Sequence, residues 1–181
     1  MRRPHWTGSR WCRTGTAASG DRFAQLTGFP VWPGPAQDTD DPAQGPAGPE
    51  AARSALRELV RASTHRYATH AHGEPIMLVH AATAPNAVLR TLPALPGELW
   101  APSLRAAWAA SAAVTAAYAP REAAPVPASA SVAPDAGELF ARAAAHGDDH
   151  TIKFTDTALD VGDALAFSAA RRAIELNPPV F

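Results

Sequence analysis

The sequence predicts an all-α protein, built as an irregular array of several helices. Three observations lead to this prediction. Apolar residues recur at helical spacing through most of the chain after residue 48. No stretch alternates apolar and polar residues with the period of a β-strand. Prolines and aspartates stand where the periodic segments begin, which is typical of helix starts.

The chain divides into two regions by composition. Residues 1–48 are rich in glycine and proline and lack periodicity, which predicts an irregular, largely disordered segment. Within it, residues 22–33 are apolar enough to dock as a short segment. Residues 49–181 form the helical region. A flexible linker rich in proline, alanine and serine is expected within it, over residues 119–134.

Helix boundaries follow from the prolines, glycines and aspartates. Pro49 opens a helix that we expect to run to about Ala71, with Gly73 as its stop. The apolar run after Pro75 predicts two short helices divided at Pro85, because proline is tolerated at the start of a helix. A further helix is expected over residues 98–118. The last three helices are expected to begin at or beside Asp135, Asp148 or Asp149, and Asp163.

Composition and charge narrow the class of protein. The 181 residues carry a net charge of -1, which argues against a nucleic-acid surface held by phosphate contacts. About a quarter of the chain is alanine, which buries little area, so the expected core is thin. One cysteine forms no internal disulfide, and no secretory signal is visible. The longest apolar run, residues 106–119, is shorter than the ~20 residues of a membrane span. We expect a soluble cytoplasmic protein.

One lysine, Lys153, stands among 15 arginines. A primary amine can be deprotonated, form a Schiff base or be carboxylated to a carbamate that binds metal, and arginine does none of these. His150 precedes Lys153 by three residues, whereas His146 shares their helix face only if the helix continues through Gly147, which is expected to break it. Carboxylates that could orient imidazoles stand close by, at Asp148, Asp149 and Asp156.

Ordinary structural roles stay open for all of these residues. Lys153 is equally explained as a survivor of a codon bias toward arginine, and a histidine at a helix end near acidic residues is usually solvated. His65, His70 and His72 form a second cluster, of which the last two most simply mark a helix C-terminus. His80 is alone on an apolar segment, where most histidines are core residues. The chain has no P-loop, dinucleotide fingerprint, zinc-protease helix or nucleophile elbow.

Two stretches resemble the questin-oxidase-like family. The first, residues 72–120, holds a histidine in an LVHA-T segment, then a P-x-L-P-x-x-L-W turn and an alanine-rich helix. The second, HGDDHTIKFTDTAL at residues 146–159, contains the pattern D-D-H-x-x-K-F. A looser match at RFAQLTGFP extends the resemblance from about residue 21 to the end of the chain.

The resemblance implies an oxidoreductase. Family members open the ring of anthraquinones such as questin with O2, in a Baeyer–Villiger-like monooxygenation described with NADPH. Some are understood as non-haem iron enzymes with histidine ligands and a carboxylated lysine. For this chain the resemblance implies Fe(II) held by His80, His150 and carboxylated Lys153, and a small aromatic polyketide as substrate.

Family members are longer and carry further histidines in an N-terminal half. The resemblance therefore implies that this chain is the C-terminal half of a larger helical domain, completed by a separate N-terminal half or by a homo-oligomer. Two other functions stay open. One is a truncated, catalytically inactive helical remnant or interaction module. The other is a metal-dependent hydrolase, for which a carbamylated lysine with histidines is also suitable.

Overall fold

The computed structural model describes residues 22–23, 26, 48–126 and 135–180. All its regular elements in these ranges are helices, so the all-α prediction is confirmed. Three short 3-10 turns, Ala71–Gly73, Leu92–Ala94 and Gly97–Leu99, connect the first helices. The α-helices are α2 (Pro49–His70), α3 (Pro75–Thr91), α4 (Trp100–Tyr118), α5 (Ala136–His146), α6 (Asp149–Val161) and α7 (Ala164–Leu176).

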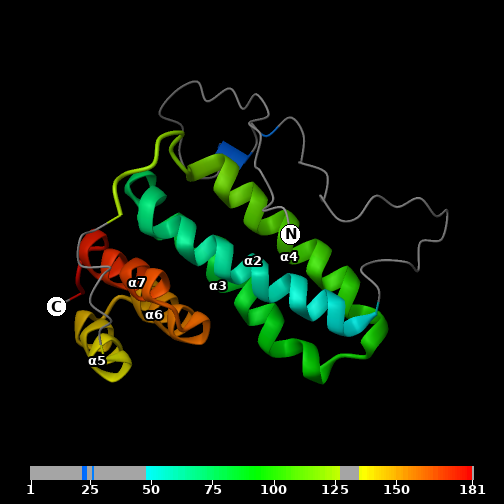
Figure 1. Cartoon of the computed structure of the whole chain (residues 1–181). Coiled ribbons are helices and arrows are strands. Elements are labelled where there is room, and N and C mark those ends of the chain that lie inside the picture. Colours follow the sequence, from blue (N-terminus) through cyan, green and yellow to red (C-terminus); the bar gives the residue numbers. More distant parts are fainter. Residues whose placement is uncertain (1–21, 24–25, 27–47, 127–134, 181) are drawn as a thin grey trace.

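The helices form two groups that share α2. Figure 1 shows α2, α3 and α4 as three long helices that run side by side, with the shorter α5, α6 and α7 gathered at one end of them. Helix α2 contacts α3 and α4 on one side and α6 and α7 on the other. Helix α3 also contacts α6, and this contact positions the candidate site described below.

The core is built largely from alanine, as the composition predicts. The main cluster joins Tyr67 of α2, Val79 of α3 and Phe154 of α6, with alanines of α4 and α7 filling the space between them. The rings of Tyr67 and Phe154 pack with their centroids 4.1 Å apart. Small side chains let helices approach closely, so an alanine-rich core is dense although each residue buries little area. Burial of a side chain such as Phe154 contributes about 1.5–3 kcal/mol.

The starts of the helices follow the sequence signals. Pro49 and Pro75 occupy the first positions of α2 and α3. Asp135, Asp148 and Asp163 are the N-caps of α5, α6 and α7, and each carboxylate accepts a hydrogen bond from an amide of the first turn. Between α5 and α6, Gly147 adopts a left-handed conformation at φ 78°, so His146 and His150 lie on different helices, as expected.

The predicted division at Pro85 is wrong, because α3 continues through this residue to Thr91. A proline inside a helix leaves the carbonyl four residues earlier without its amide donor, here the carbonyl of Ala81. The hydroxyl of Ser111 on α4 donates to that oxygen at 2.7 Å. The hydrogen bond that the proline removes is thus replaced from a neighbouring helix, a contact that the local sequence does not reveal.

The segment after α4 belongs to the expected linker. Residues 119–126 have no helix or strand, and the amide of Ala124 donates to the carbonyl of Thr69 at 2.7 Å. Residues 127–134, and most of the expected irregular segment 1–48, lie outside the described residues. From the apolar segment at 22–33, Phe23 packs edge-on against Tyr118. No helix in the described ranges has the length and apolar character to cross a bilayer.

Candidate functional site at the contact of α3 and α6

His80 and His150 lie next to each other although 70 positions separate them in the sequence. Their rings meet edge to face, with centroids 5.3 Å apart and planes at 89°. His80 belongs to α3, and His150 is the second residue of α6. The packing of these two helices therefore brings together the two histidines that the resemblance singles out. Both are partly exposed, so solvent reaches the pair.

Two aspartates surround the His150 imidazole. Its Nδ1 lies 3.0 Å from Asp149 Oδ1 and 3.5 Å from Asp148 Oδ1. Asp148 has a structural role, because its Oδ2 accepts a hydrogen bond from the Thr151 amide at 2.7 Å and so caps α6. Asp149 is exposed, and its Oδ1 is the carboxylate oxygen nearest to the His150 ring. Among the described residues, Asp148, Asp149 and His150 form the one group of three metal-ligating side chains whose donor atoms lie within 4.8 Å of one another.

Lys153 lies one helical turn after Asp149. Its Nζ donates to Asp149 Oδ2 at 2.5 Å, and its side chain is 57% exposed. This hydrogen bond, together with the charge of His150, lowers the pKa of the Asp149 carboxyl, although a small loss of hydration acts in the opposite direction. The expected site residue is therefore beside the histidine pair, but its amine contacts a carboxylate and not an imidazole.

The surroundings of His80 favour its neutral form. Burial lowers the pKa of this imidazole first, and the positive charges of His150 and Lys153 lower it further, while Asp149 acts in the opposite direction. A neutral imidazole has a free ring nitrogen lone pair, which is the form that binds a metal ion. At neutral pH His80 is thus a competent ligand.

The other histidines of the described ranges do not join this pair. His65 lies 2.8 Å from both carboxylate oxygens of Asp163, which separates it from His70 and His72. His72 is exposed in the turn after α2. His146 Nε2 lies 3.1 Å from the carbonyl oxygen of Asn177. The second cluster expected at residues 65–72 is therefore not assembled into one site.

Asp156 also has a different partner from the expected one. It accepts a hydrogen bond from Arg90 at 2.6 Å, and Arg90 also binds Asp160. Asn86 donates to the same Asp160 at 2.8 Å. These contacts hold α3 and α6 together beyond the histidine pair, so they fix the approach of His80 to His150 and are structural. The sequence signal for them was available, since Asp156 and Asp160 are spaced by one helical turn.

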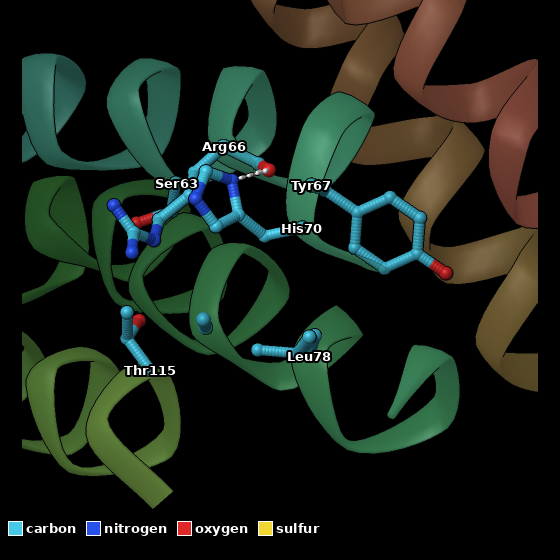
Figure 2. Close-up of a pocket in the computed structure, with 7 residues that line it drawn as sticks. Ser63, Arg66, Tyr67, His70, Leu78 and Thr115 are labelled. Atoms are coloured by element: carbon cyan, nitrogen blue, oxygen red, sulfur yellow. Dashed lines mark hydrogen bonds between the residues drawn. The ribbon is translucent and has the colours of Figure 1, made fainter. Parts of the chain in front are cut away.

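Sequence reasoning missed a second polar location, on the other side of α3. A small hollow between α2, α3 and α4, called here the Arg66 hollow, has room for about one water molecule. Figure 2 shows Arg66 and His70 of α2 at this hollow, with Thr115 of α4 opposite. The hollow is lined by Ser63, Arg66, Tyr67, His70, Leu78, Ala81 and Thr115.

Comparison of the chain with protein-family models, with curated proteins and with solved structures finds no match. The expected function therefore rests on the quoted motifs and on the geometry of the histidine pair.

Proposed function

We propose that this protein is a metal-dependent oxidoreductase of the questin-oxidase-like kind, which uses O2 to open the ring of an anthraquinone or related aromatic polyketide. The observation that carries the proposal is the approach of His80 to His150 across the contact of α3 and α6. The D-D-H-x-x-K-F and LVHA-T motifs meet at this point. NADPH as reductant and a cytoplasmic location are further parts of the proposal, and they rest on the resemblance and the composition alone.

The residues present suit a transition metal such as iron. Two imidazoles that share one ion through bonds of ~2.1 Å have ring centroids about 4.5–6.5 Å apart, a range that includes the observed 5.3 Å. Two anionic ligands are candidates: the Asp149 carboxylate, which belongs to the group with Asp148 and His150 but not with His80, and Lys153 after carboxylation, which contacts Asp149. Two imidazoles with one anionic oxygen donor are typical of non-haem Fe(II) sites.

Each group of the chain has a distinct task in this proposal. Bound Fe(II) supplies the activation of O2. His80 and His150 would hold the ion. If Lys153 supplies the anionic ligand, the carboxylate of Asp149 would accept the Nδ1 proton of His150, which fixes the ring orientation and leaves Nε2 as the ligand atom. Lys153 either balances the charge of Asp149, as the structure has it, or replaces it as the anionic ligand once its neutral amine has reacted with CO2.

Two observations favour a second function. Lys153 and Asp149 form an exposed pair at positions i and i+4, which is common on solvated helix surfaces without any ligand. An edge-to-face ring contact near 5 Å is likewise common between aromatic side chains. The alternative is thus a catalytically inactive helical module that has kept the histidine pair as a packing contact.

Metal binding separates the two functions. The full chain and the variants His80→Ala and His150→Ala are each reconstituted anaerobically with Fe(II) and desalted. The iron content of each protein is then measured. His72→Ala is the matched control, since this histidine is exposed and belongs to the turn after α2. We expect iron in the wild type and in the control and a loss of at least about tenfold in affinity in the two ligand variants. Equal iron in all four proteins would contradict the metal site.

The anionic ligand is tested with Lys153→Arg and Asp149→Asn. Arginine keeps the positive charge but cannot form a carbamate. If Lys153 is carboxylated, the wild type incubated with ¹³C-bicarbonate and Fe(II) gives a carbamate carbon signal, and Lys153→Arg loses both signal and iron. Retention of iron by Lys153→Arg, with its loss in Asp149→Asn, would assign the ligand to Asp149. Oxygen consumption with an anthraquinone panel, with and without NADPH, then tests turnover, and turnover would eliminate the inactive module.

A further inference from the structure

Three buried polar side chains connect the end of α7 with the start of α6. They belong to Asp148, Thr151 and Asn177, and each of these residues is at most 9% exposed. The side-chain NH2 group of Asn177 donates to the Thr151 hydroxyl oxygen at 2.9 Å, across 26 positions of the sequence. A buried polar group costs free energy unless it is hydrogen-bonded, so these side chains depend on one another. We call the three residues the Asn177 network.

The hydrogen bonds of the Asn177 network run in one direction, toward Asp148. Because the NH2 group of Asn177 only donates, the Thr151 hydroxyl accepts from it and keeps its own proton for another acceptor. That acceptor is the Asp148 carboxylate, which receives hydrogen bonds from both the hydroxyl and the amide of Thr151. Burial acts to raise the pKa of the Asp148 carboxyl, but these bonds and His150 hold it below its ordinary value. The carboxylate therefore stays charged at neutral pH.

Asn177 also holds the turn that carries Asp148. Its backbone carbonyl oxygen lies 3.1 Å from Nε2 of His146, the last residue of α5. Its side chain holds the first turn of α6 through Thr151. Asn177 therefore contacts both helices that flank the turn at Gly147 and Asp148. The position of the Asp148 carboxylate thus depends on a residue that follows the last helix.

His150 lies at the other end of the Asn177 network. Thr151 holds Oδ2 of Asp148, and Oδ1 lies 3.5 Å from His150 Nδ1. Asp149 lies nearer to this nitrogen, at 3.0 Å, but it is also a candidate ligand of the ion in the proposed function. If Asp149 binds the ion, His150 needs another carboxylate for its Nδ1 proton. Asp148 is the other carboxylate in contact with this nitrogen within the described ranges, and a movement of about 0.5 Å brings it to hydrogen-bond distance.

We propose that Asn177 is a positioning residue for His150. It acts through the Thr151 hydroxyl and the Asp148 carboxylate, and this carboxylate accepts the Nδ1–H of the imidazole when Asp149 binds the ion. Such a hydrogen bond leaves Nε2 as the ligand atom. The inference rests on the proposed function for its effect on the ion, whereas its effect on the imidazole is a property of the metal-free protein.

Four variants of the full chain test the Asn177 network. Thr151→Val removes the hydroxyl and keeps the shape of the side chain, and Asn177→Ala removes the first donor; these are the two disrupting variants. Thr151→Ser keeps the hydroxyl and is the rescue variant. Thr155→Val is the matched control, because Thr155 lies one turn further along α6, is equally buried, and its hydroxyl has no hydrogen-bond partner in the part of the chain that the structure describes.

The first readout is the tautomer of the His150 imidazole in metal-free protein, measured by ¹⁵N NMR at a pH where the ring is neutral. All variants are made in an Asp149→Ala background, in which Asp148 is the remaining carboxylate at the ring. We expect the Nδ1–H tautomer in this background and in the rescue and control variants, and a shift toward the Nε2–H tautomer in the two disrupting variants. An unchanged tautomer in the disrupting variants would overturn the positioning role.

The second readout is the Fe(II) affinity of the variants with Asp149 intact, measured well below their thermal unfolding midpoints. We expect the two disrupting variants to bind Fe(II) at least about tenfold more weakly than the wild type, and the rescue and control variants to match the wild type. Equal affinity in the disrupting variants and the wild type would overturn the positioning role. Absence of iron from the wild type would instead contradict the proposed function, and the tautomer would then decide the role of Asn177.

Discussion

The hydroxyl of Ser111 donates to the carbonyl of Ala81 at 2.7 Å, and that carbonyl is the one that Pro85 leaves without an amide donor. All three residues are buried. The serine of α4 therefore compensates for the proline of α3, because its hydroxyl replaces the amide that the proline lacks. Ala81 and Pro85 lie on α3 close to His80, so the hydrogen bond from Ser111 supports the helix that carries His80.

Ser111→Ala is expected to destabilise the protein by about 1–3 kcal/mol, because it leaves a buried carbonyl unsatisfied. In a protein that also carries Pro85→Ala, the destabilisation by Ser111→Ala should be smaller, because the amide of residue 85 can then donate to the Ala81 carbonyl within the helix. Chemical denaturation of the two single variants and the double variant measures the coupling free energy. Additive effects would contradict the assigned relationship. Ser63→Ala is the control, because its hydroxyl bonds Ser111 and not a freed carbonyl.

Asp163 is expected to make stability depend on acid pH. Burial works to raise the pKa of its carboxyl, but the Ala166 amide, His65 and Arg61 together hold it below its ordinary value. A lowered folded-state pKa means that the unfolded chain binds the proton first. The stabilisation is thus present above about pH 4 and is lost as the pH falls through the folded-state value.

Asp163→Asn tests this dependence, because asparagine keeps the N-cap of α7 and removes the charge. We expect it to lower the free energy of unfolding by about 1 kcal/mol at neutral pH, with a weaker dependence on pH between about 2 and 4 than in the wild type. Urea titrations across that range measure both effects. Asp135→Asn, at the exposed cap of α5, is the control, and an identical profile for the two variants would contradict the role of the His65 and Arg61 contacts.

The charges around His80 give a prediction that is independent of any metal. Lys153→Gln should raise the pKa of His80 and Asp149→Asn should lower it, because these two side chains act on the imidazole with opposite signs. Lys153→Arg keeps the charge and should leave the pKa unchanged. Imidazole NMR titrations in metal-free buffer measure these directions. No response to either charge removal would show that the two side chains lie farther from His80 than the structure places them.

The lowered pKa of His80 also determines in which direction its protonation changes the stability of the protein. The unfolded imidazole, with its pKa of about 6.5, takes up a proton before the folded one does. Above that pH, protonation of His80 has no effect on the free energy of unfolding. As the pH falls toward the folded-state pKa of His80, the uptake of the proton by the unfolded chain lowers the stability of the protein. His80→Gln should remove this loss, and calorimetry between about pH 5 and 7 should show a flatter stability profile for the variant.

Gly73 has no room for a side chain. A Cβ there would stand 2.6 Å from Pro120 Cδ and 2.7 Å from the Tyr118 carbonyl oxygen. Gly73→Ala is therefore expected to cost about 1–3 kcal/mol, through displacement of the segment after α4. Gly137→Ala is the control, because the added methyl would meet only Asp135 Oδ1 at 3.4 Å. We expect that control to be neutral or more stable by up to about 1 kcal/mol in thermal unfolding; equal losses would contradict the steric argument.

Most helix boundaries could be predicted because their signals are local. The prolines at 49 and 75 and the aspartates at 135, 148 and 163 act on the first turn of their own helices, and the structure has helices that start there. Pro85 shows the limit of this reasoning. Whether a proline ends a helix depends on what satisfies the freed carbonyl, and the donor is 30 positions away in the sequence.

The candidate site could be predicted only in part for the same physical reason. The LVHA-T and D-D-H-x-x-K-F motifs identify His80 and His150 as candidates. Their contact, however, depends on how α3 packs on α6. The spacing of His65, His70 and His72 predicts one cluster, but His65 instead contacts Asp163, 98 positions away. Arg66 gave no signal at all, because an arginine without an acceptor is visible only once its neighbours are in place.

The two kinds of helix start divide the molecule by its response to acid. Helices α2 and α3 begin with prolines, which carry no proton to gain, while α5, α6 and α7 all begin with carboxylates that hold first-turn amides. Protonation is therefore expected to weaken the capped first turns of α5, α6 and α7, whereas the prolines at the starts of α2 and α3 do not titrate. Amide hydrogen exchange at falling pH should reveal α5–α7 as a cooperative unit that opens before the long helices, and the histidine pair lies on the boundary between them.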